Sequence, residues 1–213
     1  KDFRSTTRDV QALLADLKRK GVDGIVVDLR GNGGGSLTEA TDLTGLFIDK
    51  GPVVQVKDSF GKVEVENDVA AGAAYSGPLA VLVDRNSASA SEIFSAAMQD
   101  YGRAIIIGEP TFGKGTVQTL IDLNRYVPGN GEDLGRLRLT MAEFYRISGG
   151  STQLRGVEPD ILFPTAPQGA EHGERSLENA LPWNSIHPAK YDKTKLGDLG
   201  TFREASTQRI GGD

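Results

Sequence analysis

The chain has 213 residues, of which 38% are hydrophobic and 25% charged, with a formal net charge of −5. This length and composition suit one globular domain with a hydrophobic core and room for an appendage. The acidic balance argues against nucleic acid as the partner. The sequence has no run of about 18 apolar residues, the length that a membrane-spanning helix needs. The chain begins at Lys1 without a methionine or a signal peptide, so we expect a fragment or a processed piece.

Rare residue types exclude several kinds of chemistry. The sequence contains no cysteine, which excludes thiol catalysis, disulfides and zinc–thiolate sites. Both histidines, His172 and His187, lie in the polar C-terminal stretch. A Ser-His-Asp hydrolase or a multi-histidine metal site is therefore not expected, and a hydrolase built on this chain would need a base other than histidine.

The order of hydrophobic patterns predicts an α/β fold made of layers. Three of the expected strands, over residues 24–29, 79–84 and 103–108, have the unbroken apolar character of buried strands. From Pro164 onward the sequence is polar, and we expect a peripheral tail. The remaining expected elements are a helix closed by Gly21, a helix from Ser36 to near Gly51, a hairpin over 53–65, a loop over 66–77, a helix over 90–101, a loop over 108–115, a strand over 117–123, a loop over 125–136, a strand over 137–145, a turn over 148–151 and a last strand over 161–163.

Residues 87–94 connect a predicted buried strand to a predicted helix. Ser89 fits the N-cap position of that helix, and Glu92, three residues later, completes a capping box. A small hydroxyl at a helix start lies where backbone N–H groups are free to hold an anion. A Ser-x-x-Glu pattern alone is usually only a helix cap, so a functional interpretation depends on the other loops.

A glycine-rich loop over residues 30–35 lies between a strand and a helix. Successive glycines let backbone N–H groups converge on an anion. The loop does not match the dinucleotide fingerprint, because Ser36 occupies the third glycine position. Two interpretations remain open, a tight turn without a ligand and an oxyanion hole.

The loop over residues 108–116 nearly matches a phosphate-binding P-loop. Gly115 occupies the position of the Mg²⁺ ligand, and the residues that follow have the pattern of a strand, whereas a P-loop opens a helix. A P-loop NTPase is therefore kept only as an alternative. Lys114 is either a solvated loop lysine or, since glycines flank it, a residue whose backbone passes close to another part of the fold.

A serine nucleophile needs a base, and without a suitable histidine the remaining common choice is lysine. The base must be neutral, and the reference pKa of lysine is about 10.4. We therefore expect the fold to bury Lys114 and lower its pKa. Thr116 and Gln118 share a strand face with Lys114 and are candidates to orient the amine, although Gln118 also fits a plain exposed strand residue.

Taken together, these motifs resemble the carboxyl-terminal processing peptidases, and within that family its periplasmic tail-specific branch. The resemblance covers most of residues 5–164 in the order of the family, and the motifs are jointly very specific. The matching segments are residues 28–35, 87–94, 98–103, 108–118 and 156–160, and residues 179–183 of the tail also match.

The resemblance implies a Ser-Lys endopeptidase on a crotonase-like and ClpP-like α/β core, with additional strands and no cofactor. The implied substrates are unfolded or C-terminally tagged proteins in the periplasm, and the implied partner is a lipoprotein adaptor. The site residues carried over are Ser89 as nucleophile, Lys114 as general base, Gln118 as the residue that orients the lysine, the N–H groups of Gly35 and Ala90 as the oxyanion hole, and Asp100 in a supporting role that is catalytic or structural.

One feature of the family is not found in this sequence. Members carry an upstream PDZ domain that binds the substrate C-terminus, whereas residues 1–20 here read as a single helix. We therefore expect a catalytic core over residues 1–164 and a peripheral extension over residues 165–213. The alternative from another class is a protease-like binding scaffold without catalysis, against which the intact Ser89, Lys114 and Gln118 argue.

Overall fold

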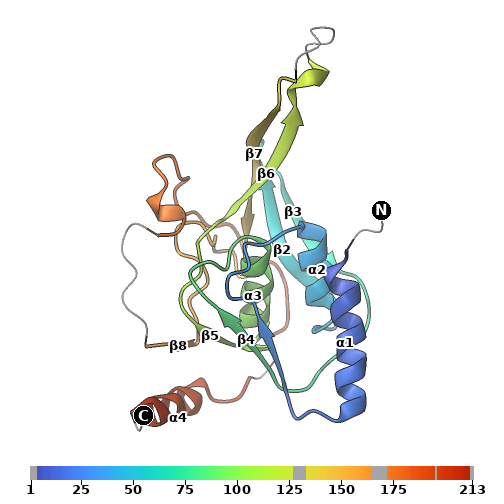
Figure 1. The fold of residues 1–213 in the computed structure, drawn as a ribbon, viewed down its shortest axis with the longest axis vertical. Helices are drawn as coiled ribbons and strands as arrows, with labels where there is room; N and C mark the ends of the chain where they lie inside the picture. The colour runs from blue at the N-terminus through green and yellow to red at the C-terminus, as the bar shows by residue number, and fades with distance from the viewer. Residues whose placement is uncertain (1–3, 127–132, 165–171, 195, 212–213) are drawn as a thin grey trace.

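The computed structural model describes residues 4–126, 133–164, 172–194 and 196–211. Two sheets enclose a pair of helices, so the predicted layered α/β class is confirmed (Figure 1). The elements are α1 (Thr6–Lys20), β1 (Ile25–Asp28), α2 (Leu37–Gly45), β2 (Gly51–Asp58), β3 (Val63–Asp68), β4 (Leu79–Val83), α3 (Ala90–Tyr101), β5 (Ile105–Gly108), β6 (Thr116–Asp122), β7 (Arg136–Tyr145), β8 (Ile161–Leu162) and α4 (Leu199–Ile210), with short 3₁₀ turns at Leu123–Arg125 and Glu174–Ser176.

The first sheet is parallel and has the strand order β1-β4-β5-β8. Val81 at the centre of β4 pairs with Val27 of β1 and with Ile106 of β5. Because these strands are parallel, each must cross back to the starting edge of the sheet before the next begins. Their carboxyl ends therefore lie side by side, and the loops that leave them meet at one edge.

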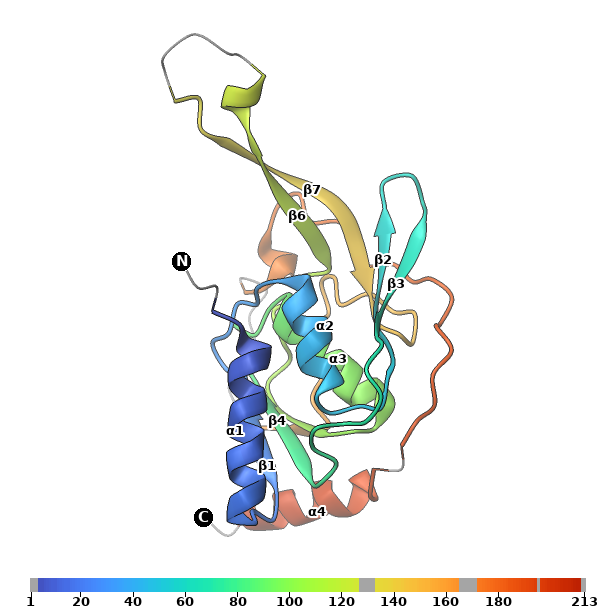
Figure 2. The ribbon, with the colours of Figure 1, turned by 90° about the vertical axis from the view of Figure 1, so that its right-hand side faces the viewer.

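The second sheet is antiparallel, with the order β3-β2-β7-β6. Strands β6 and β7 form a long hairpin that projects from the body of the molecule in both views (Figures 1 and 2). Since β6 lies at the end of the strand order, no strand among the described residues pairs with its outer edge. This strand begins at Thr116, two residues after Lys114.

Helix α3 lies between the two sheets and forms the centre of the core (Figure 2). All of its residues except Ala90 and Gln99 are buried. Its small side chains let both sheets approach closely, while Phe94 stacks edge-to-face on Phe47 with ring centroids 5.7 Å apart. The helix begins and ends as the sequence predicts, and Gly102 closes it in the left-handed conformation.

The structure differs from the sequence predictions in a few elements. The strand over 24–29 is not fully buried, because one face of the parallel sheet is less covered than the other, which leaves Val26 of β1 61% exposed. Helix α2 ends at Gly45, where Leu46 and Phe47 turn back to bond the carbonyls of its last turn. Strand β3 extends to Asp68, three residues into the expected loop. Part of the expected loop over 125–136 lies outside the described residues.

The described part of the C-terminal segment contacts the core at several points. Glu174 is buried against the loop before Lys114, and residues 183–189 run beside residues 147–151. Helix α4 lies near β8, and Arg203 donates to the Asp160 carbonyl. No helix within the described ranges is both long and apolar enough to cross a membrane.

Candidate active site

Ser89, the predicted nucleophile, lies at the turn between β4 and α3. It is the N-cap of α3 and has φ 58° and ψ −115°, a conformation that L-residues rarely adopt. Such backbone strain costs on the order of 1–3 kcal/mol and persists only where the surroundings enforce it. A serine on a sharp, strained turn from strand to helix presents its hydroxyl outward, as the nucleophile of a hydrolase does.

The glycine loop lies directly against this turn. A Cβ on Gly34, which has φ +96°, would lie 2.6 Å from the Ala88 carbonyl oxygen and 2.8 Å from the Ala90 nitrogen. Only glycine therefore allows this approach. The next residue, Gly35, and Ala90 both line the pocket at Ser89. Within the described residues, neither of their N–H groups forms a hydrogen bond. Two free N–H groups beside a serine are the kind of donors from which an oxyanion hole is built.

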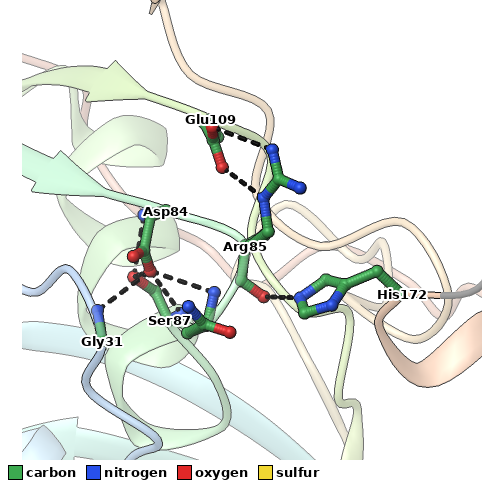
Figure 3. Close-up of polar contacts among 7 residues, drawn as sticks. Gly31, Asp84, Arg85, Ser87, Glu109 and His172 are labelled. Atoms are coloured by element: carbon green, nitrogen blue, oxygen red, sulfur yellow. Dashed lines mark hydrogen bonds and ion pairs between the residues drawn. The ribbon is translucent and has the colours of Figure 1, made fainter. Parts of the chain in front are cut away.

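Hydrogen bonds to one side chain and to one backbone carbonyl hold the glycine loop against the serine turn. Asp84 Oδ1 accepts hydrogen bonds from the backbone N–H groups of Gly31, at 2.9 Å, and Ser87, at 3.0 Å (Figure 3). The backbone carbonyl of Asn32 accepts a hydrogen bond from the Ala88 N–H, at 3.0 Å. These bonds link the loops after β1 and β4, which are about 50 residues apart in sequence.

Lys114, the predicted base, shares the pocket with Ser89. The pocket has a volume of about 440 Å³ and is lined on one side by the first residues of β6. Lys114 Nζ donates to Gln118 Oε1 at 3.3 Å, and Thr116 is buried nearby. No hydrogen bond joins Lys114 Nζ to Ser89 Oγ among the described residues.

The predicted burial of Lys114 is only partly observed. Its backbone lies in a packed loop, but its side chain is half-buried and Gln118 is exposed. The reason is that the side chain extends into a pocket that is open to water. Excluding water from the amine would thus require something to fill the pocket.

Buried side chains hold the backbone on both sides of Lys114. Glu92 Oε2 accepts from the Lys114 N–H at 2.9 Å, and Thr152 Oγ1 donates to the Lys114 carbonyl at 2.9 Å. The next N–H, of Gly115, donates to Gln153 Oε1 at 2.8 Å. An irregular buried loop needs such partners for its peptide groups, and here they fix the peptide planes that orient the lysine.

Glu92 is fully buried and accepts hydrogen bonds at both carboxylate oxygens. Oε1 accepts from Thr111 Oγ1 at 2.6 Å and the Gly113 N–H at 2.7 Å, and Oε2 from the Ser89 and Lys114 N–H groups. Burial raises the pKa of Glu92 to about 7, although the hydrogen bonds oppose this rise. The predicted capping-box residue therefore also links the serine turn to the lysine loop.

Asp100 lies at the opposite end of α3 and does not line the pocket. Its carboxylate pairs with the Arg146 guanidinium at 2.6 Å and 3.1 Å and accepts from Ser148 Oγ at 3.0 Å. Of the two roles left open for Asp100, these contacts favour the structural one. The ion pair anchors the turn after β7 to the helix.

Sequence reasoning missed several residues that build the site. Asn32 and Asp84 lie within or beside the quoted motifs, and a polar residue next to a glycine loop was an available signal. Thr152 and Gln153 come 38 residues after the peptide groups that they bond, and nothing in their local pattern points to the lysine loop. The structure also gives no support to a P-loop, because Thr116 begins a strand instead of a helix.

Comparisons with known proteins agree with this arrangement. Residues 1–163 match the model of peptidase family S41, and residues 168–213 match the C-terminal domain of tail specific protease (DUF3340). The chain is 52% identical over 185 residues to a tail-specific protease of Haemophilus influenzae, covering 87% of the chain and 27% of that protein. It is 42% identical over 167 residues to a carboxy-terminal-processing protease of Bartonella bacilliformis, covering 76% of the chain and 35% of that protein.

A solved structure, the photosystem II D1 C-terminal processing protease, has a similar fold. Its TM-score is 0.65 at 34% identity, over 76% of this chain and 40% of that one. The chain thus spans between about a quarter and two fifths of the length of these relatives. Since the family model covers most of the chain, including the serine turn, the glycine loop and the lysine loop, the chain belongs to peptidase family S41.

Proposed function

We propose that the protein carrying this chain is a serine-type endopeptidase that cleaves unfolded or tagged proteins near their C-termini, with Ser89 as nucleophile and Lys114 as base. One observation carries the proposal. A serine on a strained helix-start turn, two free N–H groups and a lysine held by buried side chains all line one pocket. Serine with lysine is a known variant of the catalytic triad.

The reaction follows from these positions. Neutral Lys114 takes the proton of the Ser89 hydroxyl as Oγ bonds to the carbonyl carbon of the substrate. The negative charge on the carbonyl oxygen is stabilised by the N–H groups of Gly35 and Ala90. The protonated lysine gives its proton to the leaving amine, the C–N bond breaks, and an acyl-enzyme remains. Water, deprotonated by Lys114, then hydrolyses the ester and restores the serine.

The open pocket gives the substrate a part in assembling the site. The amine of Lys114 bonds to Gln118 and must turn from there toward Ser89. A peptide in the pocket would displace water around the amine, which favours the neutral amine over the charged one. Gln118 would orient the amine during this step.

The shape of the pocket suits an extended polypeptide. Residues 116–120 of β6 line it, and β6 is an edge strand whose free edge could pair with a peptide backbone. Recognition through backbone groups accepts many sequences, as a protease of unfolded chains requires. The names of the relatives, tail-specific and carboxy-terminal-processing protease, support substrates defined by their C-termini.

The remaining features of the proposal rest on resemblance and on the family matches. Residues 1–164 would form the catalytic core, and residues 165–213 an extension, in line with the two adjacent family matches. The substrates and a lipoprotein adaptor would meet the enzyme in the periplasm.

The test is to replace Ser89 and Lys114 separately by alanine in the full-length protein and to follow cleavage of a dye-labelled unfolded casein. We expect both variants to lose turnover, and a fluorophosphonate probe to label the wild type but not S89A. Matched controls are S59A and K62A, which change exposed residues at the turn between β2 and β3. Substantial turnover by S89A or K114A would favour the alternative of a protease-like binding scaffold.

A further inference from the structure

The C-terminal segment contacts the loop that carries Lys114. We call residues 172–186 the C-terminal brace. The brace backbone bonds this loop directly, since the Glu174 N–H donates to the Phe112 carbonyl at 3.0 Å. At Gly173, a Cβ would lie 2.6 Å from the same carbonyl oxygen. The brace and the lysine loop are thus packed backbone against backbone.

One buried side chain connects the brace to the peptide bond after Lys114. Gln153 is 1% exposed, and its amide is used on both sides. Its Oε1 accepts from the Gly115 N–H at 2.8 Å. Its Nε2 donates to Glu174 Oε1 at 3.2 Å and to the Leu181 carbonyl at 3.1 Å. Because both brace acceptors fix the orientation of the amide, they also fix which atom faces the lysine loop.

The brace also holds the segment from which Gln153 extends. The Trp183 indole N–H donates to the Ser151 carbonyl at 2.9 Å, and the Ser151 N–H donates to the Asn184 carbonyl at 3.0 Å. The Arg155 guanidinium stacks on the Trp183 ring at 3.8 Å from its centroid. Residues 151–155 are therefore held by the brace on one side and hold Lys114 and Gly115 on the other.

A separate contact reaches the serine side of the site. His172 Nε2 lies 3.0 Å from the Arg85 carbonyl oxygen, four residues before Ser89 (Figure 3). A carbonyl can only accept, so Nε2 carries the proton in this contact. Figure 3 also shows the Arg85 side chain paired with Glu109, at the start of the lysine loop. The brace thus contacts the loops of both proposed catalytic residues.

We propose that the C-terminal brace is part of the catalytic apparatus, and that Gln153 is a positioning residue through which the brace sets the orientation of Lys114. The proposal rests on the proposed function of Ser89 and Lys114. Thr152 bonds the carbonyl, and Gln153 the N–H, of the peptide group between Lys114 and Gly115. Together they fix the plane of this peptide group and so the direction in which the lysine side chain leaves the backbone. The C-terminal domain thereby gains a role in the chemical step.

The deciding variant is Q153E, made in the full-length protein. An oxygen at position 153 can still accept from the Gly115 N–H, but the N–H donors toward the brace are gone. A carboxylate then faces the Glu174 carboxylate and the Leu181 carbonyl. We expect kcat for labelled casein to fall about 10- to 100-fold, as displacement of a catalytic group does, with KM little changed and fluorophosphonate labelling of Ser89 slowed in parallel.

Two variants at position 174, one conservative and one not, separate an effect on the position of Lys114 from an effect on the stability of the fold. E174Q keeps an oxygen that can accept from Gln153 Nε2 and should retain near wild-type kcat. E174A removes that acceptor and should lower kcat without raising KM. In the double variant Q153E/E174Q, the new amide can donate to the new carboxylate, so kcat should recover relative to Q153E. A merely structural role would change the free energy of unfolding in Q153E and in the double variant but leave kcat of the folded protein unchanged. The absence of a recovery in kcat would contradict the proposal.

The matched control is R203A, which removes another contact of the C-terminal region, with the Asp160 carbonyl, away from the lysine loop. Its kcat should equal that of the wild type. All rates are taken well below the melting temperature of each variant, and if Q153E does not fold, the E174A and E174Q pair decides. Activity that survives S89A would overturn the proposed function together with the brace. Activity that depends on Ser89 but is unchanged in E174A and in Q153E would overturn the brace alone.

Discussion

The backbone N–H groups of Ser89 and Lys114 donate to the same carboxylate oxygen, at 2.7 Å and 2.9 Å. That oxygen belongs to Glu92, which also accepts from Thr111 and Gly113 of the lysine loop at its other oxygen. The proposed nucleophile and base lie on loops from different strands, so a rigid link between them has to be made by tertiary contacts. A single buried carboxylate provides it.

The first prediction concerns this link. In E92Q the NH₂ group must replace one of the two oxygens. At the Oε2 position it loses the bonds from Ser89 and Lys114, and at the Oε1 position it loses the bond from Gly113, while the Thr111 hydroxyl must accept instead of donate. We expect the serine turn and the lysine loop to shift relative to each other and kcat to fall about 100-fold. Casein cleavage and fluorophosphonate labelling measure the effect, with E64Q at an exposed position of β3 as the control. Wild-type kcat in E92Q would show that the link does not set the geometry.

The second prediction concerns pH and stability. Burial raises the pKa of Glu92 from about 4.5 to about 7 in the folded protein. The folded state therefore binds the proton more tightly than the unfolded state. This stabilising contribution is fully present below about pH 4.5 and is lost as pH rises through about 7. Between pH 4.5 and 8, the free energy of unfolding of the wild type should fall by about 3 kcal/mol relative to that of E92Q. Urea unfolding at several pH values measures this difference, and a constant difference would contradict the raised pKa.

The sequence predicts the parts of this site that depend on local pattern. The caps of α3 are readable because a helix start and a glycine stop have local signatures, and Ser89 follows from them. That the three loops meet also follows from consecutive buried strands, whose carboxyl ends share an edge when they pair in parallel. The exposure of Val26 was not predictable in this way, because an apolar run does not reveal how well each face of its sheet is covered.

The contacts that orient Lys114 were not readable from the sequence. Thr152 and Gln153 follow β7 in an irregular segment, where no periodicity relates one residue to another. Their function depends on which peptide groups the fold leaves without a partner, and that is known only once the loops are packed. The same holds for the exposure of Lys114, since the openness of a pocket is a property of several elements together.

The third prediction compares two neighbouring glycines. A Cβ on Gly34 would lie within 2.8 Å of atoms of Ser89, Ala90 and Ala88, and its φ of +96° disfavours any other residue, whereas a Cβ on Gly33 would meet nothing within 4 Å. G34A should push the glycine loop away from the serine turn and remove the Gly35 N–H from the proposed oxyanion hole. We expect a loss of about 10²-fold in kcat, measured with labelled casein, while G33A stays near the wild type. Equal activity of the two variants would contradict this placement of the loop.

The last prediction assigns Asp100 to stability. Its side chain is 7% exposed and paired with Arg146, so D100N removes one charge and leaves the guanidinium without its carboxylate. Breaking a buried pair in this way costs on the order of 3 kcal/mol of unfolding free energy. D16N, which changes two exposed ion pairs of α1, should cost less than about 1 kcal/mol. Asp100 does not line the pocket at Ser89, so its replacement can only displace catalytic groups slightly and removes no reacting group. We therefore expect kcat of folded D100N to stay within about tenfold of the wild type. Urea unfolding and casein cleavage below the melting temperature measure both effects, and a fully folded but inactive D100N would instead place Asp100 in the chemistry.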